Sequence, residues 1–306
     1  MVKSAKRKKN TNKIGTASDA LYATVMLLPY GIVFCLLIFI PAMLSAVLSF
    51  TYFNMIAFPT WRGLQNFVNI LTADTVFFQH VLPNTLQFAI MTGPGGFVLS
   101  FFLAWLLAQI QAVPRNIIAL CLFSPSLGAG LGVIFGPLFS GNQFGLLNAQ
   151  LLRFNIINQP IQWWNEQQYI MPLGILLTLW GGLGLGFLAM LAGILNVDEQ
   201  VYEAAYIDGI RNRFQEIIYV TIPLTTPMML FAAVMAIAGS FNGGLIMVNN
   251  AGNPPPGYAG SVIMSHIQDF QGRMEHGYAA ALAIVLFGIV WMFGKIAFIL
   301  FGGSDR

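Results

Sequence analysis

The stretch YAAALAIVLFGIVWMFGKIAFILFG, residues 278–302, contains a single charged residue, Lys295. An α-helix needs about 20 consecutive apolar residues to cross the ~30 Å hydrocarbon core of a bilayer. The bilayer core tolerates such a run, because a helix satisfies all its backbone hydrogen bonds within the segment. The stretch therefore predicts a membrane-spanning helix.

Five more apolar runs of spanning length precede this one, at 22–50, 84–111, 117–140, 169–195 and 219–247. Over the whole chain 57% of residues are hydrophobic, 8% are charged and the mean hydropathy is +0.73. Soluble domains carry about 25% charged residues, so this composition excludes a soluble enzyme, a disordered chain and a nucleic-acid reader. We expect an all-α polytopic membrane protein, with a basic tail over 1–20 and six transmembrane helices in one domain over 21–306.

The positive charges predict how the chain is oriented. Six of the 14 Lys and Arg residues lie in the first 13 positions, ahead of the first apolar run. With the N-terminus inside, six spans place 11 basic residues on the inner side and three, Arg62, Arg153 and Arg273, on the outer side. Basic residues concentrate in cytoplasmic loops. We therefore expect a multi-pass protein of the cell membrane with both termini in the cytoplasm.

The apolar runs contain no Asp, Glu or His, and the chain has no G-x-x-x-x-G-K-[ST] phosphate loop. Ion-coupled carriers usually place ionisable groups inside the membrane. No nucleophile–base pair or metal-ligand cluster stands out either, so we expect no catalytic residue, no metal site and no cofactor in this chain. If the protein moves a solute uphill, its energy is supplied by another component.

One inner connection departs from the apolar background, NVDEQVYEAAYIDGIRNRFQEIIYVTIPLTTP at 196–227. Acidic residues at its start favour a helix N-terminus, and Gly209 stands where a chain reversal needs a positive φ. The pattern predicts two short helices that dock into a soluble partner. A simple amphipathic hairpin at the membrane surface is the alternative interpretation.

The residues of this connection resemble the EAA loop of binding-protein-dependent ABC importer permeases, in their carbohydrate-uptake branch. The resemblance rests on Glu203-Ala204-Ala205, Asp208-Gly209, Phe214, Ile222-Pro223-Leu224 and Pro227. Weaker matches follow the family order, at Trp61–Phe67 (WRGLQNF), Asn84-Thr85, Gly145–Asn148 (GLLN) and Leu191–Leu195 (LAGIL). The first of these is typical of the maltose-F-like permease, the first of the pair. The chain departs from the family at Phe241-Asn242 and Gly252-Asn253-Pro254, and it lacks that subunit's long outer insertion.

The resemblance implies a type I ABC importer permease fold and a transport subunit that is not itself an enzyme. Its implied partners are a homologous second permease, two ATPase subunits that hold ATP and Mg, an extracytoplasmic solute-binding protein, a sugar or oligosaccharide, and membrane lipid. The coupling loop at 196–218 would contact the ATPase through Glu203, Ala204, Ala205, Asp208 and Gly209.

By the family's offset from this loop, the substrate site falls at Thr178, Gly182 and Asn242, and Trp180 offers a surface for stacking a sugar ring. Helix packing is the alternative role for each of these residues. Three other functions also stay open: a permease for a non-sugar solute, an ion-coupled carrier, and an assembly subunit of a membrane enzyme. Copurification with ATPase chains would separate the importer from the last two.

Overall fold

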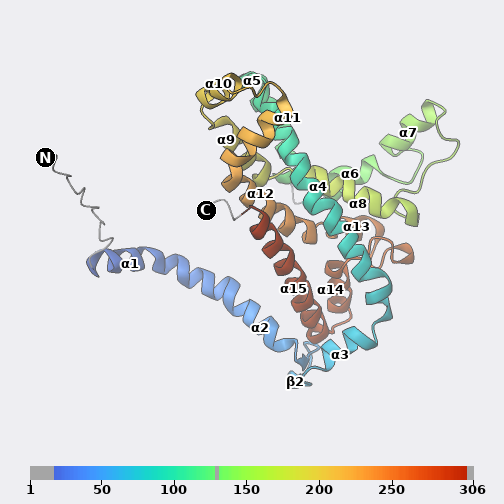
Figure 1. Ribbon diagram of the computed structural model, residues 1–306. Helices are drawn as coiled ribbons and strands as arrows, with labels where there is room; N and C mark the ends of the chain where they lie inside the picture. The colour runs from blue at the N-terminus through green and yellow to red at the C-terminus, as the bar shows by residue number, and fades with distance from the viewer. Residues whose placement is uncertain (1–16, 128–130, 302–306) are drawn as a thin grey trace.

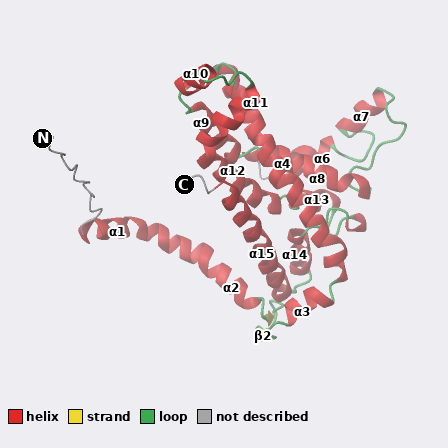
Figure 2. Ribbon diagram, viewed as in Figure 1, coloured by secondary structure: helices red, strands yellow, loops and turns green. Residues whose placement is uncertain are grey.

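The computed structural model describes residues 17–127 and 131–301, and these residues are mostly helical (Figures 1 and 2). The predicted basic tail at 1–20 lies outside the described residues except for its last four positions, which begin α1. The N-terminal and outer helices are α1 (Ala17–Phe34), α2 (Ile40–Leu48), α3 (Gln65–Thr72), α7 (Leu146–Arg153), α13 (Leu245–Ala251) and α14 (Ile263–Gly272). The remaining helices are α4 (Leu82–Ala108), α5 (Ala112–Leu127), α6 (Leu131–Leu138), α8 (Gln167–Gly181), α9 (Leu185–Leu195), α10 (Glu199–Ile207), α11 (Arg213–Glu216), α12 (Ile222–Asn242) and α15 (His276–Phe301).

Four helical stretches of the described chain are long and apolar enough to cross a membrane: Thr24–Leu48, Phe77–Ala108, Arg213–Ala251 and His276–Ile299. A fifth crossing is formed by α8 and α9 together, which bend by 46° at the break between them. The third predicted run, 117–140, is occupied by the shorter helices α5 and α6, with residues 128–130 outside the described part. The arrangement is consistent with six spans, although hydropathy alone predicted neither this division nor the bend.

Three π-helical turns lie inside long helices, and each ends two residues before a proline. The turns are η1 (Cys35–Phe39), η2 (Phe77–Val81) and η3 (Ile217–Thr221), ahead of Pro41, Pro83 and Pro223. Proline has no N–H, and its ring clashes with the carbonyl of the preceding turn. A wider turn at that point moves the carbonyl aside. The first span therefore continues through Pro41 as one helical stretch, Thr24–Leu48.

The helix formed by α1, η1 and α2 extends away from the other helices and joins them only at its far end, where α2 packs against α15 (Figure 1). No residue in its most apolar window is buried. Its apolar side chains are therefore left for lipid or another protein to cover. We call residues 17–48 the arm.

We call the half of the bundle next to the charged connection the inner half and the opposite end the outer end, after the orientation that the sequence predicts. The inner half is built where α4, α9 and α12 pack against one another. Phe187 and Met190 are fully buried between them, with Ala104 and Ala232. A Cβ on Gly186 would lie 3.2 Å from Cα of Ala232. Small residues at such contacts let helices approach closely in lipid, so this part of the bundle is the rigid frame from which the charged connection projects.

Asparagines from two of the family-like motifs hold the outer connections. Strands β1 (Thr51–Tyr52) and β2 (Thr60–Trp61) pair antiparallel, with Thr51 opposite Trp61. The buried Asn66 amide donates to the carbonyls of Ser49 and Thr51, at 2.8 and 2.9 Å. The Asn84 amide donates to Tyr258 O at 2.9 Å, across 174 residues of sequence. These short motifs are thus explained by hydrogen bonds that close the outer end of the bundle.

Asn148, in the GLLN motif, organises the protruding segment around α7. Its side chain is fully buried. Its amide donates to three carbonyls, those of Ser140, Asn142 and Ile161, at 3.0–3.2 Å. Its oxygen accepts from Ile161 N and Trp163 Nε1. A single amide therefore satisfies five backbone and side-chain groups, which is why that position needs asparagine.

Candidate functional site

The charged connection folds as a hairpin of α10 and α11 at one end of the bundle (Figure 1). Asp198 caps α10 by accepting from Gln200 N at 3.0 Å, and Asn212 caps α11 by accepting from Phe214 N at 3.1 Å. Capping by Asp and Asn satisfies backbone N–H groups that the first turn leaves free. The start of each of the two helices is thus set by local sequence. We call residues 196–216 the coupling hairpin.

The turn between the two helices depends on Gly209, which has a φ of +98°. Gly209 N donates to Tyr206 O at 3.2 Å, and Ile210 N donates to Ala205 O at 3.0 Å. This pair of bonds is the Schellman motif, which ends a helix with a left-handed residue. Nothing lies within 4 Å of the position where a Cβ would stand. Glycine is therefore required by the backbone conformation, and neighbouring atoms play no part.

The sequence predicted a separate short helix as the second helix of the hairpin. In the structure α11 is instead the first turn of a longer helix. It continues through η3 into α12 without a break. A displacement of α11 would consequently be passed along the helix axis into the membrane. The sequence did not predict this continuity because the charges of Arg213 and Glu216 mask the start of the apolar run.

The motif residues of α10 and its turn are accessible. Glu203, Ala204, Asp208 and Gly209 are exposed, and Ala205 is half-buried. Apolar side chains beside them are also exposed, with Ile207 at 84% and Phe214 at 74%. Exposed apolar groups among charged ones are typical of a protein-binding surface.

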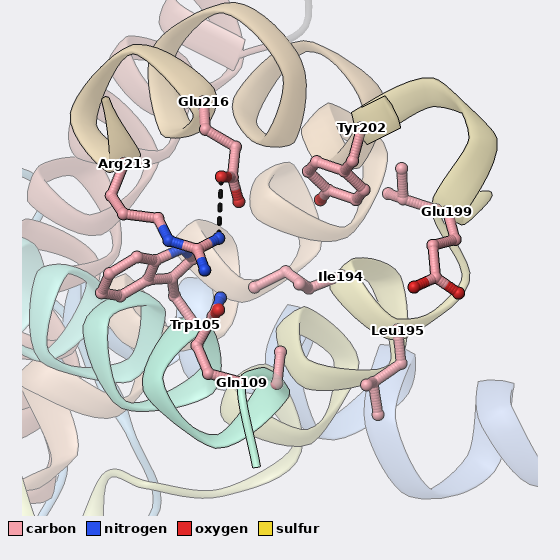
Figure 3. A pocket seen from close by; sticks show the side chains of 10 residues that line it. Trp105, Gln109, Ile194, Leu195, Glu199, Tyr202, Arg213 and Glu216 are labelled. Atoms are coloured by element: carbon pink, nitrogen blue, oxygen red, sulfur yellow. Dashed lines mark hydrogen bonds and ion pairs between the residues drawn. The ribbon is translucent and has the colours of Figure 1, made fainter. Parts of the chain in front are cut away.

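A cavity of about 370 Å³ separates the coupling hairpin from the ends of α4 and α9 (Figure 3). Trp105 and Gln109 come from the α4 end, Glu199 and Tyr202 from α10, and Arg213 from α11. The Tyr202 hydroxyl lies 3.3 Å from Thr221 Oγ1. That contact links α10 to the start of the long helix, so the hairpin is held at its base and free at its tip.

The predicted substrate residues lie where two apolar helices are interrupted. The break between α8 and α9 spans Gly182–Gly184. A smaller break at Gly243-Gly244 separates α12 from α13, where both glycines keep helical φ and ψ and the stretch Arg213–Ala251 continues. Broken helices inside a membrane are tolerated where they are buried in protein or line a cavity. A Cβ on Gly243 would lie 2.7 Å from Cγ2 of Thr178. The two breaks therefore meet at Thr178.

The structure brings some of the four predicted residues together. The half-buried Thr178 has a buried hydroxyl with no hydrogen-bond partner among the described residues. Gly182 donates its N–H to Thr178 O at 2.7 Å, and a Cβ there would lie 2.9 Å from that same oxygen. Trp180 is 49% exposed, with its ring centroid 6.2 Å from that of Phe135. Asn242 is the last residue of α12, and its side chain lies outside the described part.

An apolar cavity of about 300 Å³ lies next to the second break, between α4, α12 and α15. Its walls include Phe97, Ile237, Phe241 and Phe293, and Ser240 is its single polar side chain. A sugar needs several hydrogen-bonding groups around its hydroxyls. This cavity therefore does not suit a sugar, and the breaks at Thr178 fit one better.

The outer end of the bundle contains a buried polar cluster that no sequence pattern predicted. Asp74 Oδ2 lies 2.8 Å from His266 Nε2 and accepts from the Tyr278 hydroxyl at 2.8 Å. Asp74 Oδ1 accepts from Phe77 N at 2.9 Å. The sequence could have indicated only that Asp74, three residues before Phe77, caps the start of a helix. Its partners lie 192 and 204 positions away.

The charge of Asp74 is stabilised by these contacts. Burial of the carboxyl group would by itself raise its pKa, but the hydrogen bonds from His266, Phe77 N–H and Tyr278 outweigh burial and hold the pKa of Asp74 below its usual range. Hydrogen bonds to the ionised form favour that form. The cluster thus joins the start of the second span to α14 and α15. We call Asp74, His266 and Tyr278 the outer clamp.

A membrane bundle that has a broken span at its centre and an exposed polar hairpin at one end has the features expected of a transport subunit. Residues 96–301 match the family described as binding-protein-dependent transport system inner membrane component, and the chain belongs to this family. It is a permease subunit of an ABC transporter family, and members of that family are transport components rather than enzymes.

Two curated relatives and one solved structure show how far the likeness extends. The probable ABC transporter permease protein YesP of Bacillus subtilis is 31% identical, over 94% of this chain and 91% of YesP. The arabinooligosaccharides transport system permease protein AraP of the same organism is 30% identical, over 78% of this chain and 76% of AraP. A bacterial alginate ABC transporter, solved with an alginate pentasaccharide-bound periplasmic protein, superposes with a TM-score of 0.74 at 20% identity, over 92% of this chain and 93% of its own. The expected importer permease fold is confirmed by this match.

Proposed function

We propose that this chain imports a sugar or oligosaccharide across the cell membrane by alternating access, as one permease of an ATP-driven ABC importer. The observation that carries the proposal is the coupling hairpin, which displays the EAA motif on an exposed helix ended by Gly209. The names of AraP and of the alginate transporter support a carbohydrate substrate.

In this proposal Glu203, Ala204, Ala205, Asp208 and Gly209 contact an ATPase subunit, which holds ATP and Mg. Closure of two ATPase subunits displaces the coupling hairpin. The continuous helix from α11 to α12 passes that displacement to the break at Gly243. Each of the two membrane states must bind a different form of the ATPase pair more tightly, because only differential affinity shifts such an equilibrium.

The substrate path passes between the two helix breaks. Thr178, Gly182 and Asn242 are proposed to line the sugar site, with the unpartnered hydroxyl of Thr178 as a hydrogen-bond donor. The exposed ring of Trp180 offers an apolar face on which a sugar ring stacks. An ion-coupled carrier is not favoured, because the described spans carry no carboxylate beyond Glu216, which lies in the first turn of the stretch that begins at Arg213.

The orientation follows from the hairpin. An ATPase works in the cytoplasm, so the coupling hairpin and both termini face inward. The outer clamp then faces the solute-binding protein, a partner supported by the periplasmic protein in the alginate complex.

The arm supports a second permease as partner. The arm contains a spanning helix of 25 residues, and no residue in the most apolar window of this helix is buried. We propose that a homologous permease covers this helix. Cys35 lies on the arm and is exposed, which makes it a natural position for crosslinking.

The test is copurification of the full chain from its own membranes, followed by crosslinking through Cys35. We expect two ATPase chains and one sister permease, with the Cys35 adduct on the sister permease. A Cys121→Ser background removes the other exposed cysteine, and a Cys35→Ser variant is the control. A chain that purifies alone and transports with an ion gradient would contradict the proposal.

A further inference from the structure

The cavity beside the coupling hairpin has no role in the mechanism above, yet its walls come from both the bundle and the hairpin. Ala108 and Leu195, the last residues of the apolar helices α4 and α9, form part of its lining. Apolar helices end where the hydrocarbon ends and the lipid headgroups begin. The cavity of about 370 Å³ therefore lies at headgroup depth.

The charges of the lining are separated across the cavity. Figure 3 shows Arg213, paired with Glu216, on one side together with Trp105 and Gln109, and the carboxylate of Glu199, unpaired within the described chain, on the other side. Arg213 Nη1 donates to Glu216 at 2.9 Å, which leaves most of its five N–H groups for other partners. With two carboxylates and one guanidinium, the lining carries a formal charge of −1.

One polar atom of a lining residue lacks a hydrogen-bond acceptor. Trp105 Nε1 is buried and has no hydrogen-bond partner among the described residues. A buried N–H without an acceptor is costly, and indole groups at headgroup depth usually donate to a polar atom of the lipid. The Trp105 side chain lines the cavity, so a small rotation of its ring would bring this N–H to an acceptor bound beside Arg213.

We propose that this cavity binds the zwitterionic headgroup of phosphatidylethanolamine. The phosphate lies on the side of Arg213 and Trp105, which supply N–H donors. The ammonium group lies on the side of Glu199, which supplies an anionic acceptor. The net negative charge of the residues that line the cavity disfavours a lipid with a net negative charge, such as phosphatidylglycerol. The assignment to the inner leaflet rests on the proposed orientation.

The bound headgroup would connect α4 to both helices of the coupling hairpin. It therefore favours the hairpin position seen here over a displaced one, by its difference in affinity between the two. Lipid composition then tunes how readily an ATPase moves the hairpin, without any contact between lipid and substrate.

For the test, the full chain and any partners that copurify are reconstituted in nanodiscs that contain equal amounts of phosphatidylethanolamine and phosphatidylglycerol. Native mass spectrometry then measures how much of each lipid the protein retains. Trp105→Phe keeps the ring and removes the N–H, and Glu199→Gln removes the charge. We expect each to lower retained phosphatidylethanolamine about tenfold, as a lost charged or buried hydrogen bond implies. Trp291→Phe and Glu166→Gln, the same changes at an exposed ring of α15 and an outer loop, should leave retention unchanged.

Three results would overturn the proposal: equal retention of the two lipids by the unmodified chain, unchanged retention in both cavity variants, or displacement of the lipid by an equal concentration of soluble glycerophosphoethanolamine. Gln109→Ala, at an exposed position of the same wall, serves as the third variant if Trp105→Phe lowers the melting temperature. Retention is independent of ATP hydrolysis. Failure here with intact copurification of ATPase chains would therefore leave the proposed function standing.

Discussion

The two ends of this bundle are built differently. At the outer end, buried side chains bond across large sequence distances, as in the outer clamp and at Asn84. At the inner end, the coupling hairpin is held by local caps and presents exposed motif residues. Buried hydrogen bonds resist displacement because their partners would be left unsatisfied, whereas an exposed hairpin moves at little cost. The comparison supports the proposed mechanism, in which the outer end is fixed and the inner hairpin moves as a lever.

The largest stability effect is expected at the outer clamp. Asp74→Ala leaves His266 and Tyr278 unpaired at a site where the Asp74 side chain is 10% exposed. Breaking a buried pair by removing one partner costs about 3–5 kcal/mol. Melting temperature in nanodiscs measures this loss. Asp269→Ala, which removes the exposed pair with Arg273, should cost about 0.5 kcal/mol. Equal shifts in both variants would show that the outer clamp contributes no more than a surface pair.

The next largest effect is expected at Asn148. Asn148→Ala removes five hydrogen bonds at a fully buried position. We expect a loss of about 2–3 kcal/mol, because several buried groups lose their partner. Limited proteolysis around residues 140–165 reports the change locally. Asn165→Ala, at an exposed position of the same segment, is the control, and similar cleavage of both variants would contradict this account.

Acid should weaken the outer end selectively. The folded pKa of Asp74 is lowered, so its contribution to stability is complete above the unfolded pKa of about 4 and is lost as the pH falls through the lower folded value. The melting-temperature difference between the unmodified chain and Asp74→Asn should be constant from pH 7 to 5 and shrink below about pH 4. A difference that stays constant down to pH 3 would contradict the assignment.

The smallest stability effect is expected in the coupling hairpin. Asp198→Ala removes the cap on Gln200 N and should cost about 1 kcal/mol locally, with almost no change in global melting temperature. Hydrogen exchange at the start of α10 should rise. Asp198→Asn, which keeps an accepting oxygen, should exchange like the unmodified chain. A global melting shift as large as that of Asp74→Ala would remove the contrast between the two ends.

The sequence was sufficient for the parts of the fold that depend on local pattern. Hydropathy predicted where the spans lie, and the EAA motif predicted the hairpin with Gly209 at its turn. Both signals are carried by neighbouring residues, since a 20-residue apolar run and a capped helix need no distant partner. The fourth and fifth spans were predicted as continuous. The fourth is broken at Gly182–Gly184, whereas the fifth continues past a two-residue turn at Gly243-Gly244.

Long-range contacts could not be predicted from one sequence. The pairing of Asp74 with His266 depends on how α14 returns to the second span, and the meeting of Thr178 with Gly243 depends on the packing of α8 against the end of α12. The wall of the cavity beside the hairpin likewise combines Trp105 with Arg213, from helices far apart in the chain. In each case the sequence shows that a side chain can form a polar or close contact, but it does not show which distant residue that side chain contacts.

The most direct test of the movable inner lever is substrate-stimulated ATP hydrolysis by the reconstituted complex carrying Gly209→Pro. Proline holds φ near −65° and has no N–H, so it excludes the +98° backbone and removes the bond to Tyr206 O. Gly252→Pro is the matched control, because Gly252 has a φ of +87° and donates its N–H to Val248 O at the outer end of α13. The account predicts that Gly209→Pro inserts normally and loses stimulation at least about tenfold, as a displaced docking surface implies, while Gly252→Pro retains it. Normal stimulation in Gly209→Pro would contradict the account.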